Sequence, residues 1–349
     1  MTSTSYFENL QLNAPMRLDR LLKPVKSSQR STNVIVQEMC SGRQIHLDDS
    51  FYRGVEVLRF LDKHLGTLGP RASFKERSVH IRNSRVIAER LWIHFTNHKV
   101  SLDGVEVGSL LHTLYPRSSE GFIPFVSLRE IAGAHKRIVE GIHYPVLGRR
   151  LHPFFGVYYP TRTEHIELFA TWLSQYKGER SHCVDVGVGS GILTFLLAKA
   201  GFQSIDAIDQ NPNALWSVKE ELERYPVGVQ INLHHADLLN PVSSTSLIVF
   251  NPPWIPGEAN SSVTEALFFD GGLFERFFEQ AHQILDIDGR IVLIFSTILT
   301  LIRPDIRHPI ETELQKGRFE LVQKLQRKVK PKQGQRTKEK VQVWELRRL

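Results

Sequence analysis

The chain has 349 residues, of which 41% are hydrophobic and 23% are charged, values typical of a soluble globular protein of about two domains. This composition supports a hydrophobic core without disulfide staples, and the two cysteines, Cys40 and Cys183, are too few for a disulfide-rich secreted protein. The net charge is +7, but residues 316–349 alone carry twelve Lys/Arg against three Asp/Glu, a local excess of +9.

Neither export nor membrane insertion is indicated. The first residues, MTSTSYFENLQL, have no basic start followed by an apolar block, which a secretory signal requires. The longest apolar stretch, IVLIFSTILTLI at residues 291–302, is too short to span a bilayer and contains hydroxyl side chains. We therefore expect a cytoplasmic protein with no membrane contact.

The N-terminal third is expected to be mostly helical. Residues 1–33 lack periodicity and are expected to be loosely ordered. Residues 34–140 then form a mostly helical N-terminal domain, to which we assign substrate recognition. Apolar residues recur at helical spacing in three candidate helices, at residues 51–65, 84–99 and 128–142.

A linker rich in Gly, Pro and aromatic residues follows at residues 141–165, and its composition predicts that it packs on the next domain. Strands and helices alternate over residues 166–349, which predicts a mostly parallel α/β sheet that ends in an antiparallel hairpin. The expected strands are residues 182–188, 204–210, 229–238, 246–250, 289–296, 318–329 and 340–348. The expected helices are residues 191–201, 211–225 and 273–285.

Glycines cluster where the first of these strands turns into a helix. Asp185, Gly187, Gly189 and Gly191 form D-x-G-x-G-x-G. Glycines at such a turn allow a ligand to approach the backbone, and the first turn of the helix offers unpaired N–H groups. A dinucleotide-binding turn would instead place its third glycine at Ile192.

The spacing resembles motif I of class I S-adenosylmethionine (SAM)-dependent methyltransferases. This resemblance implies a Rossmann-like fold and S-adenosyl-L-methionine as the cofactor. Asp209 ends the second strand, at the sheet edge where a carboxylate can hold ribose hydroxyls. Asp237, at the end of the third strand, matches the position that contacts adenine in that family.

A second motif follows the fourth strand. Asn251, Pro252, Pro253 and Trp254 match the N/D-P-P-Y/F/W motif of amino-methyltransferases, which act on nitrogens conjugated to a ring or a carbonyl. Such a nitrogen gains positive charge as it becomes tetrahedral, so acceptor oxygens aimed at its hydrogens stabilise the transition state. Asn251 offers a side-chain oxygen, Pro252 offers a rigidly held carbonyl, and Trp254 can stack on a flat target group. No metal is needed.

A narrower resemblance covers residues 141–349. NPPWIPG and the run GRRLHPFFGVYYPTRTEH are similar to the corresponding segments of HemK-like protein-glutamine N5-methyltransferases. This places Thr161 near the cofactor and Arg162 and Glu164 near the acceptor, although the same residues can cap the helix that begins near Thr163. The family's P-R-P-E-T-E run is altered here, and Trp254 replaces its tyrosine.

These residues do not identify the molecule that accepts the methyl group. The first hypothesis is an N-methyltransferase acting on a macromolecule, either a protein glutamine amide or an exocyclic amine of an RNA or DNA base. In the nucleic-acid version the basic residues at 316–349 would contact phosphates. The alternatives are a small-molecule N-methyltransferase and a catalytically inactive Rossmann-like binding scaffold.

Overall fold

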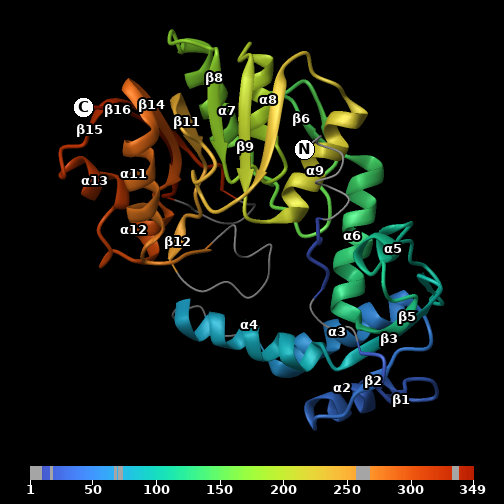
Figure 1. The fold of residues 1–349 in the computed structure, drawn as a ribbon. Helices are drawn as coiled ribbons and strands as arrows, with labels where there is room; N and C mark the ends of the chain where they lie inside the picture. The colour runs from blue at the N-terminus through green and yellow to red at the C-terminus, as the bar shows by residue number, and fades with distance from the viewer. Residues whose placement is uncertain (1–9, 16–18, 67–68, 70–73, 257–267, 332–337) are drawn as a thin grey trace. The chain divides into compact units, whose positions relative to one another are not determined.

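The computed structural model describes residues 10–15, 19–66, 69, 74–256, 268–331 and 338–349 (Figure 1). The chain divides into two units, one spanning Leu12–Val139 and the other containing Glu140–Leu349. None of the helices among these residues has the length and apolarity that a membrane crossing requires.

The N-terminal unit combines helices with a five-stranded sheet. The sheet order is β1-β2-β3-β4, with β5 also paired to β3. The strands are β1 (Val25–Lys26), β2 (Ile45–His46), β3 (Leu91–Thr96), β4 (Lys99–Val100) and β5 (Glu120–Pro124). The helices are α2 (Thr32–Cys40), α3 (Phe51–Leu65), α4 (Phe74–Ala88), α5 (Leu110–Leu114) and α6 (Phe125–Glu140).

This sheet was not expected from the sequence, which predicts helices alone in this domain. Helical residues outnumber strand residues, and α3 and α6 lie close to the ranges predicted for them, but the helix predicted at residues 84–99 is wrong beyond Ala88. The run LWIHF is buried at nearly every position, and a fully buried strand and a buried helix show the same apolar pattern. A short strand, β1, also lies within the stretch expected to be loosely ordered.

The C-terminal unit holds a seven-stranded sheet of order β10-β9-β8-β11-β14-β16-β15 (Figure 1). Its strands are β8 (His182–Val186), β9 (Ser204–Asp209), β10 (Gln230–His235), β11 (Thr245–Phe250), β14 (Leu285–Ser296), β15 (Phe319–Lys328) and β16 (Lys340–Arg348). Its helices are α7 (Glu164–Gln175), α8 (Ile192–Lys199), α9 (Pro212–Arg224), α11 (Leu273–Ile284), α12 (Ile298–Ile302) and α13 (Pro309–Leu314). Two small sheets pair β6 (Ile142–Tyr144) with β7 (Arg149–Leu151) and β12 (Ile255–Pro256) with β13 (Phe268–Phe269).

The pairing directions confirm the predicted α/β class. Strands β10, β9, β8, β11 and β14 pair in parallel, whereas β14–β16 and β16–β15 pair in antiparallel fashion. A parallel sheet is covered by helices on both faces, which is why its central strands are buried along most of their length. The carboxyl ends of β8, β9 and β11 therefore meet at one edge of the sheet, where a ligand site is expected.

Residues 141–165 pack on the C-terminal unit, largely against α9. The Phe154 N–H donates to the hydroxyl of Ser217 at 3.1 Å. The side-chain amide of Asn213 donates to the Phe155 carbonyl at 2.8 Å, and that of Asn211 donates to the Gly156 carbonyl at 2.9 Å. These bonds bring Tyr158 and Pro160 to the carboxyl edge of the sheet.

Candidate functional site

The glycine turn between β8 and α8 is a tight loop with left-handed backbone. Gly187, Gly189 and Gly191 have φ of +68°, +51° and +81°, values that other residues adopt only with strain. The Gly187 N–H donates to the Ile208 carbonyl at 2.8 Å, which ties the turn to β9. A Cβ atom on Gly189 would lie 3.2 Å from the Tyr158 carbonyl oxygen, so glycine is required for this close approach.

Asp209 lies directly beside this turn. Its carboxylate accepts the Gly189 N–H at 2.9 Å and the Asn211 N–H at 2.8 Å. Removal from water raises the pKa of Asp209 to about 6, although the backbone N–H donors oppose that shift. These backbone N–H groups thus orient the carboxylate of Asp209, which is predicted to hold ribose hydroxyls.

Asp185 lies on β8 just before the glycine turn and is fully buried. Its carboxylate accepts a hydrogen bond of 2.5 Å from the hydroxyl of Thr194 on α8. Burial raises the pKa of Asp185 to about 7. Asp185 is not among the residues that line the cavity described below, and its hydrogen bond with Thr194 helps to position the start of α8.

The NPPW segment follows the last residue of β11. The Asn251 side-chain oxygen is buried and has no hydrogen-bond partner within the described part of the chain. A buried acceptor without a donor is unfavourable by about 1–3 kcal/mol and is resolved when a ligand supplies the donor. Asn251 is therefore suited to receive an N–H group from a bound molecule.

Trp254 is held away from the cavity. Its indole N–H donates to the Ile294 carbonyl at 3.2 Å, and its ring meets the ring of His165 edge-on at 5.2 Å. It packs against the hydrophobic core of the C-terminal unit and is absent from the cavity lining. In this arrangement Trp254 anchors the motif, whereas we predicted that it faces the target group.

One cavity of about 200 Å³ joins the two motifs. It lies at the carboxyl edge of the sheet, and its walls come from the glycine turn, the ends of β8, β9 and β11, and the start of α11. The lining residues are Tyr158, Pro160, Val186, Gly187, Val188, Gly189, Ser190, Ile192, Leu193, Ile208, Asp209, Gln210, Asn211, Ala214, Ala236, Asp237, Leu238, Phe250, Asn251, Pro253, Phe269, Asp270, Leu273 and Arg276. The predicted cofactor turn and the predicted catalytic amide thus share one space.

Acidic side chains dominate the outer part of this cavity. Asp237 and Asp270 lie on either side of Arg276, whose guanidinium is 3.9 Å from the first carboxylate and 3.4 Å from the second. With Asp209 included, three carboxyl groups and one guanidinium line the cavity. The site is suited to a ligand that carries positive charge.

Besides Asp185 and Trp254, five predicted residues lie outside the cavity lining: Gly191, Pro252, Thr161, Arg162 and Glu164. Thr161 is exposed on the linker. Arg162 forms an ion pair with Glu339 at 3.1 Å, and Glu164 accepts the Lys330 N–H at 3.0 Å. Both side chains therefore connect the start of α7 to the segment between β15 and β16. Pro160, their neighbour, does line the cavity.

Sequence reasoning missed Tyr158, Asn211, Asp270 and Arg276 as site residues. Asn211 could have been found, because it follows Asp209 closely and caps α9 by accepting the Asn213 N–H at 3.1 Å. The other three carry no local signal. They reach the cavity only because the linker and α11 fold back to the carboxyl edge of the sheet.

The segment that carries both motifs is similar to a known family. Residues 166–317 match the model of the methyltransferase small domain. The match contains the glycine turn, Asp209, Asp237 and the NPPW segment, and it agrees with the predicted class I methyltransferase resemblance.

Proteins with sequences similar to this chain have differing named substrates. A putative protein N5-glutamine methyltransferase of Methanocaldococcus jannaschii is 30% identical over 34% of this chain and 62% of its own. A tRNA1(Val) (adenine(37)-N6)-methyltransferase of Escherichia coli is 35% identical over 21% of this chain and 32% of its own. The chain thus spans less than two thirds of either relative. The structure of a ribosomal protein L11 methylase from Lactobacillus delbrueckii subsp. bulgaricus aligns with a TM-score of 0.39, at 20% identity over 53% of this chain and 79% of that chain.

Proposed function

We propose that the protein is a SAM-dependent N-methyltransferase that methylates a planar amino or amide nitrogen of a macromolecule. The observation that carries this proposal is the unpartnered oxygen of Asn251, in the same cavity as the glycine turn and Asp209. The family match and the named relatives support the same class of reaction.

The described residues fit the cofactor. SAM supplies an electrophilic methyl group on a sulfonium, and the net negative charge of the cavity suits a cationic ligand. Gly189 lies so close to the Tyr158 carbonyl that a side chain at this position would take up the space that a ligand needs. Asp209 would hold the ribose hydroxyls, Asp237 would contact the adenine, and the turn would border the methionine part.

Asn251 would orient the acceptor nitrogen. Its side-chain oxygen would accept one N–H of the planar nitrogen, and the rigid Pro252 carbonyl would accept the other. Both interactions strengthen as the nitrogen gains positive charge, which favours the transition state over the bound substrate. Trp254, fixed by Ile294 and His165, would keep Asn251 in place.

Two measurements test this proposal. Calorimetric titration with SAM should show binding at one site. Incubation with SAM labelled in its methyl group and fractionated cell lysate should then label macromolecules, and separate nuclease and protease digestions should identify the acceptor class. A protein that does not bind SAM, or that labels small molecules alone, would show the proposal to be wrong.

A further inference from the structure

Charge is divided unevenly among three parts of the chain. Residues 12–139 contain twenty Lys/Arg against twelve Asp/Glu, a net charge of +8. Residues 140–315 contain twelve against twenty-one, a net charge of −9, and residues 316–349 carry +9. The C-terminal unit is therefore neutral as a whole, and the surplus positive charge of the protein lies on the N-terminal unit.

Ion pairs take up part of the positive charge of residues 316–349. Several basic side chains of this segment contact carboxylates of the same unit. The pairs are Lys316 with Glu313, Arg318 with Glu313, Arg327 with Glu167, and Arg347 with Glu320 and Asp288. Lys324 instead lies over the ring of Trp344, with its nitrogen 3.5 Å from the ring centre. Part of the positive charge of this segment thus stabilises the fold.

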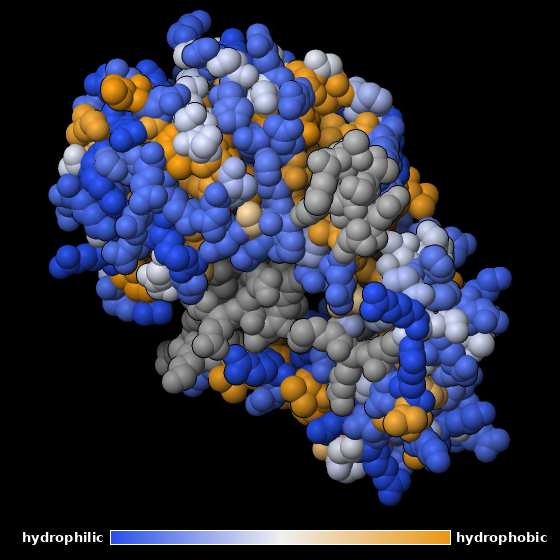
Figure 2. All heavy atoms as spheres, viewed as in Figure 1, coloured by the Kyte–Doolittle hydropathy of each residue, from blue (hydrophilic) through white to orange (hydrophobic). Residues whose placement is uncertain are grey.

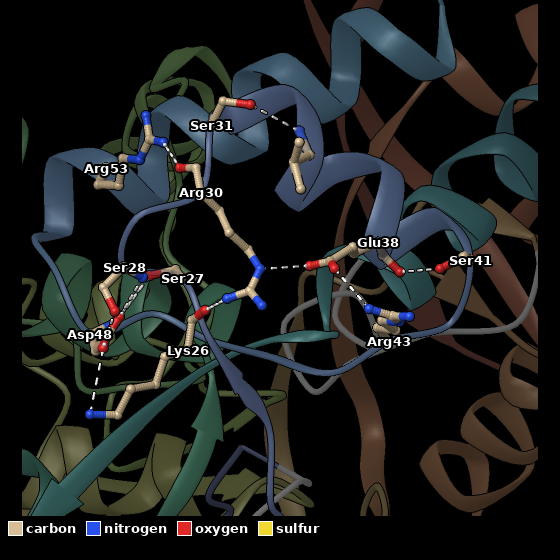
Figure 3. Close-up of polar contacts among 11 residues, drawn as sticks. Lys26, Ser27, Ser28, Arg30, Ser31, Glu38, Ser41, Arg43, Asp48 and Arg53 are labelled. Atoms are coloured by element: carbon tan, nitrogen blue, oxygen red, sulfur yellow. Dashed lines mark hydrogen bonds and ion pairs between the residues drawn. The ribbon is translucent and has the colours of Figure 1, made fainter.

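Several acids of the N-terminal unit are already shared among its cations. Glu38 on α2 pairs with Arg30 at 3.2 Å and with Arg43 at 2.9 Å (Figure 3). Asp48 accepts hydrogen bonds from Ser27 and Ser28, and Lys26 lies 3.8 Å from it. These carboxylates cannot neutralise further basic residues on the same unit.

Helix α3 presents unpaired cations on its outer side. Its buried residues, Gly54, Val57, Leu58 and Leu61, lie on one side, and the spacing of Tyr52, Arg59 and Lys63 places these three on the opposite side. Glu56 lies on that side too, but its carboxylate pairs with Arg53 at 3.0 Å. Tyr52 is 73% exposed. Arg59 and Lys63 are exposed and have no ion-pair partner among the described residues. Helix α4 packs against α3 and adds Arg82, which is also exposed.

We propose that the N-terminal unit binds single-stranded RNA through the α3–α4 basic face, defined as Tyr52, Arg59, Lys63 and Arg82. This inference rests on the proposed function and narrows its acceptor to an RNA base. Hydrophilic residues predominate on the visible face of this unit (Figure 2), as a surface that contacts a phosphate backbone requires.

The combination of residues favours RNA over an acidic peptide. Cations spread along two helices suit a chain of regularly spaced phosphates, and an exposed tyrosine ring offers a stacking surface for a base. An acidic peptide would gain from the cations but not from the exposed ring. An acceptor protein bound through acidic side chains is therefore the competing outcome of the test.

The test is fluorescence anisotropy of the full chain with a labelled single-stranded RNA of about 20 nucleotides, measured over a range of KCl concentrations. The triple variant Arg59→Glu/Lys63→Glu/Arg82→Glu should bind about tenfold more weakly or worse. Its plot of log affinity against log salt should be less steep by about 2, because each phosphate contact to single strands contributes about 0.7. Tyr52→Ala should weaken binding with no change in that slope.

A matched control makes the same change of net charge on the C-terminal unit. Lys177, Arg307 and Lys328 are exposed and have no ion-pair partner among the described residues. The variant Lys177→Glu/Arg307→Glu/Lys328→Glu should keep wild-type RNA affinity within about twofold, since the contacts of the α3–α4 basic face are intact. Equal loss in both triple variants, or no loss in the first, would overturn the proposal. So would tighter binding of labelled poly-glutamate than of RNA.

SAM titration separates this inference from the proposed function. Both triple variants should bind SAM as the wild type does, which also shows that the C-terminal unit is folded. If the protein binds RNA but not SAM, the RNA-binding role of the α3–α4 basic face stands and the methyltransferase proposal is refuted. If it binds SAM and labels protein acceptors but does not bind RNA, the methyltransferase proposal stands and the RNA-binding proposal is refuted.

Discussion

At the scale of single residues, Asn251 is the most informative position. We expect Asn251→Ala to bind SAM with unchanged affinity and to lose methyl transfer by about 100-fold or more, the range for removal of one transition-state acceptor or donor. Calorimetry gives the first quantity, and single-turnover transfer of a labelled methyl group gives the second. Turnover equal to the wild type would exclude the role assigned to this amide.

Asp209 predicts a pH dependence of cofactor binding. Its pKa is raised to about 6, so the carboxylate is ionised above that pH and protonated below it. Protonation removes acceptor capacity for the ribose hydroxyls, so SAM affinity should fall by up to about tenfold per pH unit below about pH 6. Asp209→Asn should bind more weakly at neutral pH and lose this dependence. Identical pH curves for both proteins would contradict the assignment.

Local residue patterns predicted much of the site because each motif is short. Gly187, Gly189 and Gly191 fall within one turn, whose backbone requirement can be read from glycine spacing, and Asp185 lies on the strand just before it. The burial of Asp185 could not be predicted in the same way, since it depends on α8 packing over the strand and placing Thr194 against the carboxylate. Likewise, no local pattern reveals that Trp254 turns toward His165.

At the scale of elements, the start of α8 depends on Gly191. A Cβ atom there would lie 2.8 Å from the Phe195 ring and 3.0 Å from Val218, whereas one on Gly201, also with positive φ, would meet open space. We expect both Gly→Ala variants to be destabilised by left-handed strain of about 1–2 kcal/mol. Gly191→Ala should lose about 1–2 kcal/mol more through overpacking. Urea denaturation of the two variants measures the difference, and equal losses would show that α8 and α9 absorb the methyl group freely.

Element type was predicted well where periodicity and length agree. Helices α3, α9 and α11 were found because apolar residues recur along one side, and β8, β9 and β11 because short β-branched runs end at turn residues. The strand β3 was missed because its four buried positions carry no alternation. Only its pairing with β2 and β5 makes it a strand.

At the scale of the whole molecule, Glu345 on β16 joins parts of the C-terminal unit that are far apart in sequence. Its buried carboxylate accepts hydrogen bonds from Trp172 on α7 at 2.8 Å and from Gln323 on β15 at 2.6 Å, and it pairs with Arg290 on β14. We expect Glu345→Ala to lower the free energy of unfolding by about 2–3 kcal/mol, because partners are left buried without an acceptor.

Glu320→Ala is the control for this prediction. Glu320 also pairs with an arginine, Arg347, but both side chains are about two-fifths exposed. Its loss should lower the free energy of unfolding by less than about 1 kcal/mol. Chemical denaturation of both variants measures the contrast, and similar losses would show that burial of Glu345 adds little to the fold.

The sequence by itself determined the α/β class, the antiparallel end of the sheet and the glycine turn, and it predicts a chemical role for NPPW, because each depends on neighbouring residues. Only the tertiary structure decided that Gly189, Asp209 and Asn251 share one cavity, that Tyr158 and Arg276 complete its walls, and that several hairpin cations are paired within the C-terminal unit. These features depend on contacts between residues tens of positions apart. Such contacts arise from burial of apolar faces and pairing of charges in the folded chain, and no local spacing records them.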